Sequence, residues 1–449
     1  MSRVNFQSIV LLIFLASATF YCHEAFAQNT DMPGSDSASK KTDTTNDNSV
    51  VSEKEPSKTR IEIHLITIGP GDHFYTRGGH AAIMVAEIPE SGQPKTIVYN
   101  YGDTFWENST MELDFLLGRL TFFLGSYGDL RDTLQVYAIG QKRSAYRQKL
   151  NVSDEIAQKI KKRLEWEILP ENREYTYHHL EQICSTRIRN LLDEYLNGEL
   201  ERQLSKHIAK KSVREYGKIA ASQKIGAFVF LSDLFFGRLH DDQISIYYAS
   251  FMPDYMREWY PKVMIPPPFG NNDSQVVPLA EPPVELSLRV PPEPRFRSPV
   301  TEIVFGIFML LMLIIAYLAW RKLPEKPRFT GIWLFAFAFL SGIIGLGIVF
   351  LRMFSAVPEL SINELILTFW VTDLLLIIPA VRMIRGHAKV SKITKYYLYL
   401  KLACLVLVLG AHAFGLLYQR PLFIPISALI CAGIATLLLR RTDLAKTKV

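Results

Sequence analysis

Cys184 is the residue of this chain whose surroundings best suit nucleophilic chemistry. The apolar residues that follow it recur at helical spacing: Ile188, Leu191, Leu192 and Tyr195. This pattern places the thiol in the first turn of a helix, where unpaired backbone N–H groups and the helix dipole favour a thiolate. The thiolate is the nucleophilic form of cysteine. The alternative interpretation is a small, inert core residue.

A nucleophilic cysteine needs a base, and His80 is the candidate that the sequence favours. It follows two glycines, which permit the close approach of another segment, and it opens an apolar strand. Asn100, on the neighbouring predicted strand, would orient the imidazole, with Asp103 as second choice. His178 and His179 precede the helix and do not face the thiol by helical geometry. For each histidine the alternative is a structural role.

The histidines do not have metal-ligand spacing. His178, His179 and Cys184, with the distant His80, contain no paired Cys-x-x-Cys or His-x-x-x-His unit. We therefore predict no metal and no other cofactor.

Arg187 lies one turn after the cysteine and is a candidate for holding a phosphate or carboxylate near the thiol. The alternative is an ion pair with an acidic residue, such as Glu181 or Asp193.

The N-terminal segment predicts export. Residues 1–27 combine a basic start, an apolar run and a small-x-small cleavage site, as in a secretory signal peptide. Residues 28–60 are polar with almost nothing to bury, which indicates a disordered tether. Cys22 would be removed with the cleaved signal peptide, and Cys404 and Cys431 lie in predicted membrane helices. The thiol of residue 184 is then unpaired in an exported domain, which favours a chemical role.

Residues 61–260 predict a mixed α and β domain. Strands are expected at 61–68, 80–86, 96–101 and 130–139, and a helix at 153–169. The second and third strands, joined by a turn, form an antiparallel hairpin with His80 at one mouth. Residues 225–239 are strongly apolar but too short to span a bilayer, so they indicate a core helix or a surface for lipid.

The C-terminal part predicts a membrane domain. A proline-rich linker at 261–301 leads to five apolar runs, each near the length of a spanning helix: 302–320, 330–351, 362–381, 397–417 and 422–439. Basic residues cluster after the first, third and fifth runs, which places these connections and the tail at 440–449 in the cytoplasm. The net charge of +6 is modest, and the basic residues do not form a continuous stripe of the kind that binds nucleic acid. We therefore predict no nucleic-acid partner.

Several sequence blocks resemble the periplasmic domain of the Lnb-type lipoprotein N-acyltransferases. They are Gly79-His80, Tyr99-Asn-Tyr-Gly102, Pro170–Tyr177 with Cys184-Ser-Thr-Arg187, and Gly237–Asp242 with Phe251-Met-Pro253. The resemblance covers about residues 61–260. This chain departs from the family at Gln182-Ile183, where Asp-Asn is usual, and at Gly78, where Phe is usual.

The resemblance implies an α+β, circularly permuted papain-like periplasmic domain followed by an all-α bundle of five transmembrane helices. It implies a protein of the bacterial inner membrane that moves an acyl chain from a phospholipid, through a Cys184 thioester, to the α-amine of diacylglyceryl-cysteine lipoproteins. His80 would transfer protons, with Asn100 orienting it. Tyr101 and Tyr177, which lie in the matching blocks, join Arg187 as candidate substrate-binding residues.

Two other functions remain open from the sequence. One is a papain-like cysteine amidase or peptidase that acts on cell-wall peptides, which the membrane half disfavours. The other is a membrane scaffold or sensor with an inactive thiol domain, which Ile183 beside the cysteine keeps open.

Overall fold

The computed structural model describes residues 59–446, with gaps at 73–75, 105–109, 127, 222–225, 268–275, 290–302, 304–305, 308–309, 312, 315–316, 318–326 and 388. The predicted signal peptide and nearly all of the predicted tether therefore lie outside the described residues. Only scattered residues of the first predicted membrane run, 302–320, are described.

A seven-stranded antiparallel sheet forms the centre of the N-terminal domain, in the order β6-β4-β3-β2-β1-β5-β9. Its strands are β1 (Arg60–Ile68), β2 (His80–Ile88), β3 (Lys95–Asp103), β4 (Thr121–Ser126), β5 (Ala145–Lys149), β6 (Glu174–Thr176) and β9 (Val284–Ser287). β7 (Met264–Ile265) and β8 (Val277–Pro278) form a separate pair. The three predicted strands at the start of the domain are confirmed, and their register places Ile68 opposite His80.

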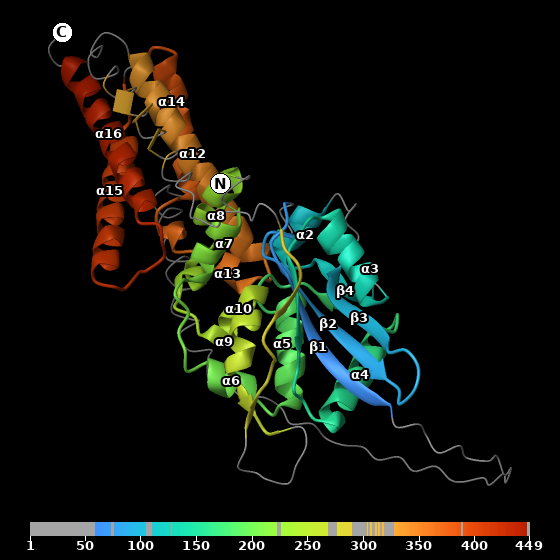
Figure 1. The fold of residues 1–449 in the computed structure, drawn as a ribbon. Helices are drawn as coiled ribbons and strands as arrows, with labels where there is room; N and C mark the ends of the chain where they lie inside the picture. Colours follow the sequence, from blue (N-terminus) through green and yellow to red (C-terminus); the bar gives the residue numbers. More distant parts are fainter. Residues whose placement is uncertain are drawn as a thin grey trace, which may run out of the picture. The chain divides into compact units, whose positions relative to one another are not determined.

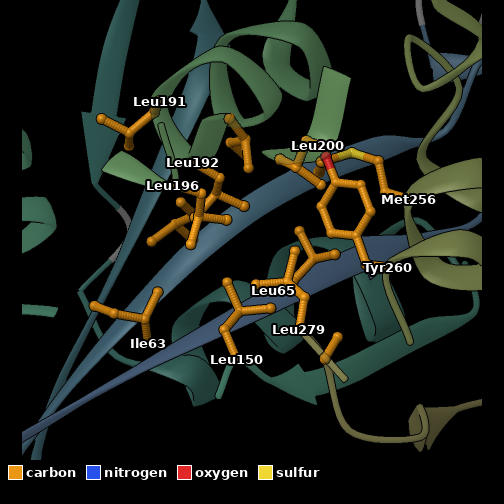
Figure 2. Packing of buried hydrophobic residues seen from close by; sticks show 14 of the residues in the cluster. Ile63, Leu65, Leu150, Leu191, Leu192, Leu196, Leu200, Met256, Tyr260 and Leu279 are labelled. Atoms are coloured by element: carbon orange, nitrogen blue, oxygen red, sulfur yellow. The ribbon is translucent and has the colours of Figure 1, made fainter. Parts of the chain in front are cut away.

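Helices cover the two faces of this sheet. α4 (Asp154–Glu167) and α5 (Cys184–Tyr195) pack on the face that carries Ile63, Leu65 and Ala81 (Figure 1). Figure 2 shows Ile63 and Leu65 in this core together with Leu191 and Leu192 of α5. Burial of these aliphatic side chains is the main force that holds α5 against the sheet.

The opposite face of the sheet carries Ala82, Met84 and Val98, which pack with Tyr137. The predicted strand at 130–139 is wrong, because this segment is α3 (Leu130–Leu134) continued by the π-helix η2 (Gln135–Gly140). Asp129 caps α3 and forms a capping box with Asp132. These local hydrogen bonds favour a helix here, although the β-branched and aromatic residues of the segment favour a strand.

The remaining elements of the domain are short helices. They are α2 (Met111–Leu117), α6 (Glu199–Leu204), α7 (Val213–Ala221), α8 (Gly226–Phe235), η3 (Arg238–Asp241), α9 (Ile246–Ala249), α10 (Pro253–Trp259) and η4 (Tyr260–Lys262). The predicted linker at 261–301 is in part folded, because β9 pairs with β5 and completes the sheet.

Three helices of the C-terminal part are long and apolar enough to cross a membrane: α12 (Pro327–Phe354), α15 (Lys392–Ala413) and α16 (Phe423–Lys446), the last over residues 423–441. A fourth candidate is bent by 47° between Pro358–Leu367 and Val371–Ile384. It contains α13 (Pro358–Ser361), η5 (Glu364–Leu367), η6 (Val371–Leu376) and α14 (Ile377–Ile384). The described residues therefore provide three spans, or up to four, where the sequence predicted five.

The third predicted span, 362–381, lies in this bent pair, and a buried carboxylate lies at its bend. Asp373 accepts a hydrogen bond from the Trp370 backbone amide and caps η6. Its carboxylate also lies 2.8 Å from Lys401 Nζ and 2.7 Å from the Tyr397 hydroxyl, with the Asp373 and Lys401 side chains fully buried. This polar cluster ties η6 to α15.

Candidate active site

His80 and Asn100 are brought together by neighbouring strands. His80 is the first residue of β2, and its Nε2 lies 3.0 Å from Asn100 Oδ1 on β3. Gly79 has a φ of +88° and lies against the Ile68 carbonyl oxygen, so a side chain there would be strained. The fallback residue Asp103 instead accepts a hydrogen bond from the Thr104 amide.

Cys184 is the first residue of α5, where the apolar spacing predicted it. The Ile183 backbone amide donates to Thr186 Oγ1 at 3.1 Å, so Thr186 stabilises the start of the helix. Burial raises the pKa of the Cys184 thiol, while hydrogen bonds from the backbone amides of Ala81 and Ser185 lower it. The expected preference for a thiolate is therefore outweighed by burial, and the resting thiol is protonated.

The thiol lies at the end of β2 that carries His80, because Ala81 follows that histidine. The imidazole shares the sheet face of Ala82 and stacks on Tyr137 with ring centroids 5.1 Å apart, whereas α5 packs on the face of Ala81. In the described atoms no hydrogen bond joins the sulfur to the imidazole.

The His80 imidazole is neutral. Burial lowers its pKa to about 4, and the positive charge of Arg143 adds to this effect, while the hydrogen bond to Asn100 opposes it. A neutral imidazole accepts a proton, as a general base must.

Arg143 is a site residue that the sequence did not reveal. It is 1% exposed; its Nε donates to the Gly69 carbonyl at 2.7 Å and its Nη1 donates to Gln141 Oε1 at 3.0 Å. Its guanidinium lies 5.2 Å from the centre of the Tyr137 ring, and Nη2 is buried without a hydrogen bond. Among the described residues no carboxylate pairs with this charge. The sequence did not indicate Arg143 because two adjacent charged residues, Lys142 and Arg143, are typical of a solvent-exposed turn.

The charge of Arg143 acts on the thiol as well as on the imidazole. It lowers the pKa of Cys184, although burial dominates there. Burial lowers the pKa of Arg143 itself to about 10, and negative charge on Tyr137 or Cys184 would raise it. A buried cation without a counter-ion is costly, so a negative charge at Cys184 would be stabilised.

Arg187 is paired with Glu167, and not with Glu181 or Asp193. Arg187 Nη2 lies 3.4 Å from Glu167 Oε2, which also accepts a 2.5 Å hydrogen bond from the Tyr101 hydroxyl. The Arg187 guanidinium stacks on Tyr101 at 5.0 Å and on Tyr175 at 4.5 Å from the ring centres. The charge of Arg187 and the hydroxyl of Tyr101 thus already have protein partners.

The third candidate for substrate binding, Tyr177, packs in an aromatic cluster. Its ring centroid lies 4.5 Å from that of Phe122 and 6.0 Å from that of Phe115. These rings provide an apolar surface beside the segment that leads to Cys184.

His178, His179 and Glu359 bring three possible metal ligands within 4.8 Å of one another. His178 Nδ1 accepts hydrogen bonds from the Leu180 and Glu181 backbone amides, so the ring proton must lie on Nε2, which faces Glu359 at 3.2 Å. A protonated Nε2 has no lone pair for a metal. In this tautomer His178 offers no free ring nitrogen to an ion.

Two family models match the chain. A model of the Lnb N-terminal periplasmic domain matches residues 54–216, and a model of the Lnb transmembrane domain matches residues 292–443. Comparison with curated proteins and with solved structures finds no match. The two matched regions together cover more than half of the chain, and the first contains His80, Asn100, Arg143 and Cys184.

Proposed function

We propose, from the premise that this chain belongs to the Lnb family, that it is a lipoprotein N-acyltransferase of the bacterial inner membrane. It would transfer an acyl chain from a phospholipid to the α-amine of diacylglyceryl-cysteine lipoproteins. The observation that carries this proposal is the cysteine at the start of α5, beside the strand end where His80 and Asn100 meet. The strand with the histidine precedes the cysteine helix in the chain, which supports a circularly permuted papain-like order.

In the first half-reaction, Cys184 Sγ attacks the ester carbonyl of the phospholipid while His80 takes the thiol proton. The ester C–O bond then breaks. His80 returns the proton to the leaving alcohol oxygen, which yields a lysophospholipid and a thioester on Cys184. The backbone amides of Ala81 and Ser185, which hydrogen-bond the sulfur, would stabilise the oxyanion.

In the second half-reaction, the lipoprotein amine attacks the thioester carbonyl and gives up a proton to His80. The C–S bond breaks, an amide forms, and the proton returns to the Cys184 thiolate. Arg143 supports both halves, because its unpaired buried charge lies where it favours a thiolate and an oxyanion.

The arrangement of the domains supports two membrane-bound substrates. The N-terminal domain packs on the membrane domain through α8, whose Leu234 joins the core of that domain with Trp333 and Leu365. This contact keeps the thiol domain at the bilayer surface, where both lipid substrates have their reacting groups. It also gives the apolar segment 225–239 a role as an interface with the membrane helices.

Replacement of Cys184 by serine tests the proposal. In a strain that contains only the variant, we expect lipoproteins to lose the N-acyl mass, measured by mass spectrometry of their N-terminal peptides. Cys404→Ser, at a partly buried cysteine of α15, is the matched control and should retain that mass. N-acylated lipoproteins in the Cys184→Ser strain would contradict the proposal.

The protonated resting thiol favours one alternative, an inactive membrane scaffold. A thiol-reactive lipid ester probe distinguishes the two functions. Labelling of Cys184 supports the enzyme, whereas a folded protein that remains unlabelled supports the scaffold.

A further inference from the structure

The segment that leads into Cys184 contacts a carboxylate of the membrane domain. Glu359, in α13, is 6% exposed, and its Oε2 lies 3.2 Å from His178 Nε2. These residues are far apart in the sequence, and Cys184 begins α5 only six positions after His178. The side chain of the membrane domain therefore reaches the entry to the candidate active site.

The His178 ring organises the segment between itself and the cysteine. Its Nδ1 accepts the backbone amides of Leu180 at 3.4 Å and Glu181 at 3.2 Å, and its carbonyl oxygen accepts the Gln182 amide at 2.9 Å. With Nδ1 acting as an acceptor, the ring proton lies on Nε2, which is 3.2 Å from Glu359 Oε2. The carboxylate thus fixes both the tautomer and the orientation of a ring that holds the turn 178–182.

Glu359 is itself held by the N-terminal domain, through backbone contacts that do not involve its carboxylate. The Gly237 amide donates to the Glu359 carbonyl at 2.7 Å, and the Arg238 amide donates to the Ile362 carbonyl at 3.2 Å. A Cβ on Gly237 would overlap the Ile362 carbonyl oxygen, so the close approach requires glycine.

A second contact lies on the other side of α13. The Ser355 hydroxyl donates to the Leu116 carbonyl at 2.6 Å, and the Ala356 amide donates to the Leu117 carbonyl at 3.1 Å. Direct hydrogen bonds therefore hold the backbone of α13 and its flanking residues against the N-terminal domain.

We propose that Glu359 is a positioning residue of the active site: the membrane domain supplies the carboxylate that holds His178 and, through it, the turn that aims Cys184. The kinetic test of this inference rests on the proposed acyl transfer, whereas the structural test does not. The inference gives the membrane domain a part in catalysis besides anchoring. The two groups lie at ion-pair distance, and both are shielded from solvent, so the attraction between them is screened less than on an exposed surface.

The test is hydrogen exchange of the full-length protein in detergent, followed by mass spectrometry of peptides that contain residues 179–184. In Glu359→Ala and in His178→Ala we expect these amides to exchange about tenfold faster or more, because each variant loses one polar contact that holds the turn. The double variant should add little to either single change, because both remove the same interaction.

Glu364→Gln is the matched control. Glu364 is a buried carboxylate of the same membrane segment, and it accepts the Tyr418 and Gln419 amides without contacting the turn 178–182. Exchange at 179–184 should be unchanged in this variant. Unchanged exchange of β1 to β3 in every variant verifies that the sheet is folded.

The kinetic readout separates positioning from general loss of structure. In Glu359→Gln we expect kcat for acyl transfer to fall about tenfold with little change in KM, since the substrate sites remain while the thiol is misplaced. Glu359→Asp should recover part of this loss. Wild-type exchange at 179–184 in folded Glu359→Ala would overturn the inference. If exchange at 179–184 is faster in Glu359→Ala but the wild-type protein transfers no acyl chain, only the proposed function is refuted.

Discussion

Cys184 and His80 both rest in their neutral forms, because burial penalises the charged form of each. It raises the pKa of the thiol above its ordinary value and lowers the pKa of the imidazole to about 4. A thiolate–imidazolium pair is therefore disfavoured. In the proposed reaction, proton transfer from sulfur to His80 would accompany attack on the ester, and Arg143 and the backbone amides would stabilise the developing negative charge.

Alkylation of Cys184 as a function of pH tests the role of Arg143. In the wild-type protein we expect the iodoacetamide rate at Cys184 to keep rising above the ordinary thiol pKa of 9.0, because burial raises the pKa. In Arg143→Gln the rate at neutral pH should fall about tenfold, which corresponds to about one further pKa unit from the lost charge. Arg143→Lys should give an intermediate rate.

Arg131→Gln, at an exposed arginine of α3, is the control and should match the wild type. A plateau of rapid alkylation in the wild type below neutral pH would show a preformed ion pair and contradict this description of the site. Equal profiles for Arg143→Gln and the wild type would exclude Arg143 from thiol activation.

At the scale of elements, the bent span is defined by a buried ion pair. Asp373 and Lys401 are both fully buried, and Lys401 also donates to the Thr368 carbonyl at 2.7 Å and lies 4.3 Å from the centre of the Trp370 ring. Ser341 of α12 donates to the same carboxylate. Three segments, α12, η6 and α15, thus meet at one charge cluster inside the membrane domain.

Asp373→Asn should destabilise the protein strongly, because it leaves the Lys401 ammonium buried without a counter-charge. Loss of one partner of a buried pair costs about 3–5 kcal/mol. In Asp373→Asn/Lys401→Met no unpaired charge remains, so much of the loss should be recovered. Thermal unfolding in detergent measures both effects. Equal stability of the single and the double variant would contradict a direct pairing.

At the scale of the whole molecule, buried histidines make stability depend on pH. Burial lowers the pKa of His64, His80 and His179 each to about 4, and it lowers the pKa of His240 as well. In the unfolded chain a histidine has a pKa of about 6.5. Between about pH 6.5 and 4 the unfolded state therefore binds more protons than the folded state, and folding weakens as the pH falls.

We expect the unfolding free energy of the detergent-solubilised protein to decrease from neutral pH toward about pH 4, with each buried histidine contributing up to about 3 kcal/mol. Replacement of one buried histidine by glutamine, as in His64→Gln, should make this decrease shallower. His207→Gln, at an exposed histidine, is the control and should leave the slope unchanged. Denaturant titrations at several pH values measure the slope. A slope of the wild type equal to that of His64→Gln would contradict the prediction.

Much of the architecture follows from local sequence patterns. Alternating residues predict the strands that carry His80 and Asn100, and helical spacing predicts that Cys184 lies in the first turn of a helix. The apolar runs predict a membrane domain, which the family comparison confirms. The helix at 153–169 is present as α4 over Asp154–Glu167. These inferences succeed because periodicity reports directly which side of an element is buried.

Only the tertiary structure decides which groups meet. Arg143, the pairing of Arg187 with Glu167, and the contact of Glu359 with His178 all join segments that no local pattern connects. The resting protonation of Cys184 likewise depends on burial by other elements, which outweighs the helix N-terminus seen in the sequence. A periodic pattern defines the buried face of an element, but desolvation and charge pairing depend on what covers that face, and this is a property of the assembled fold.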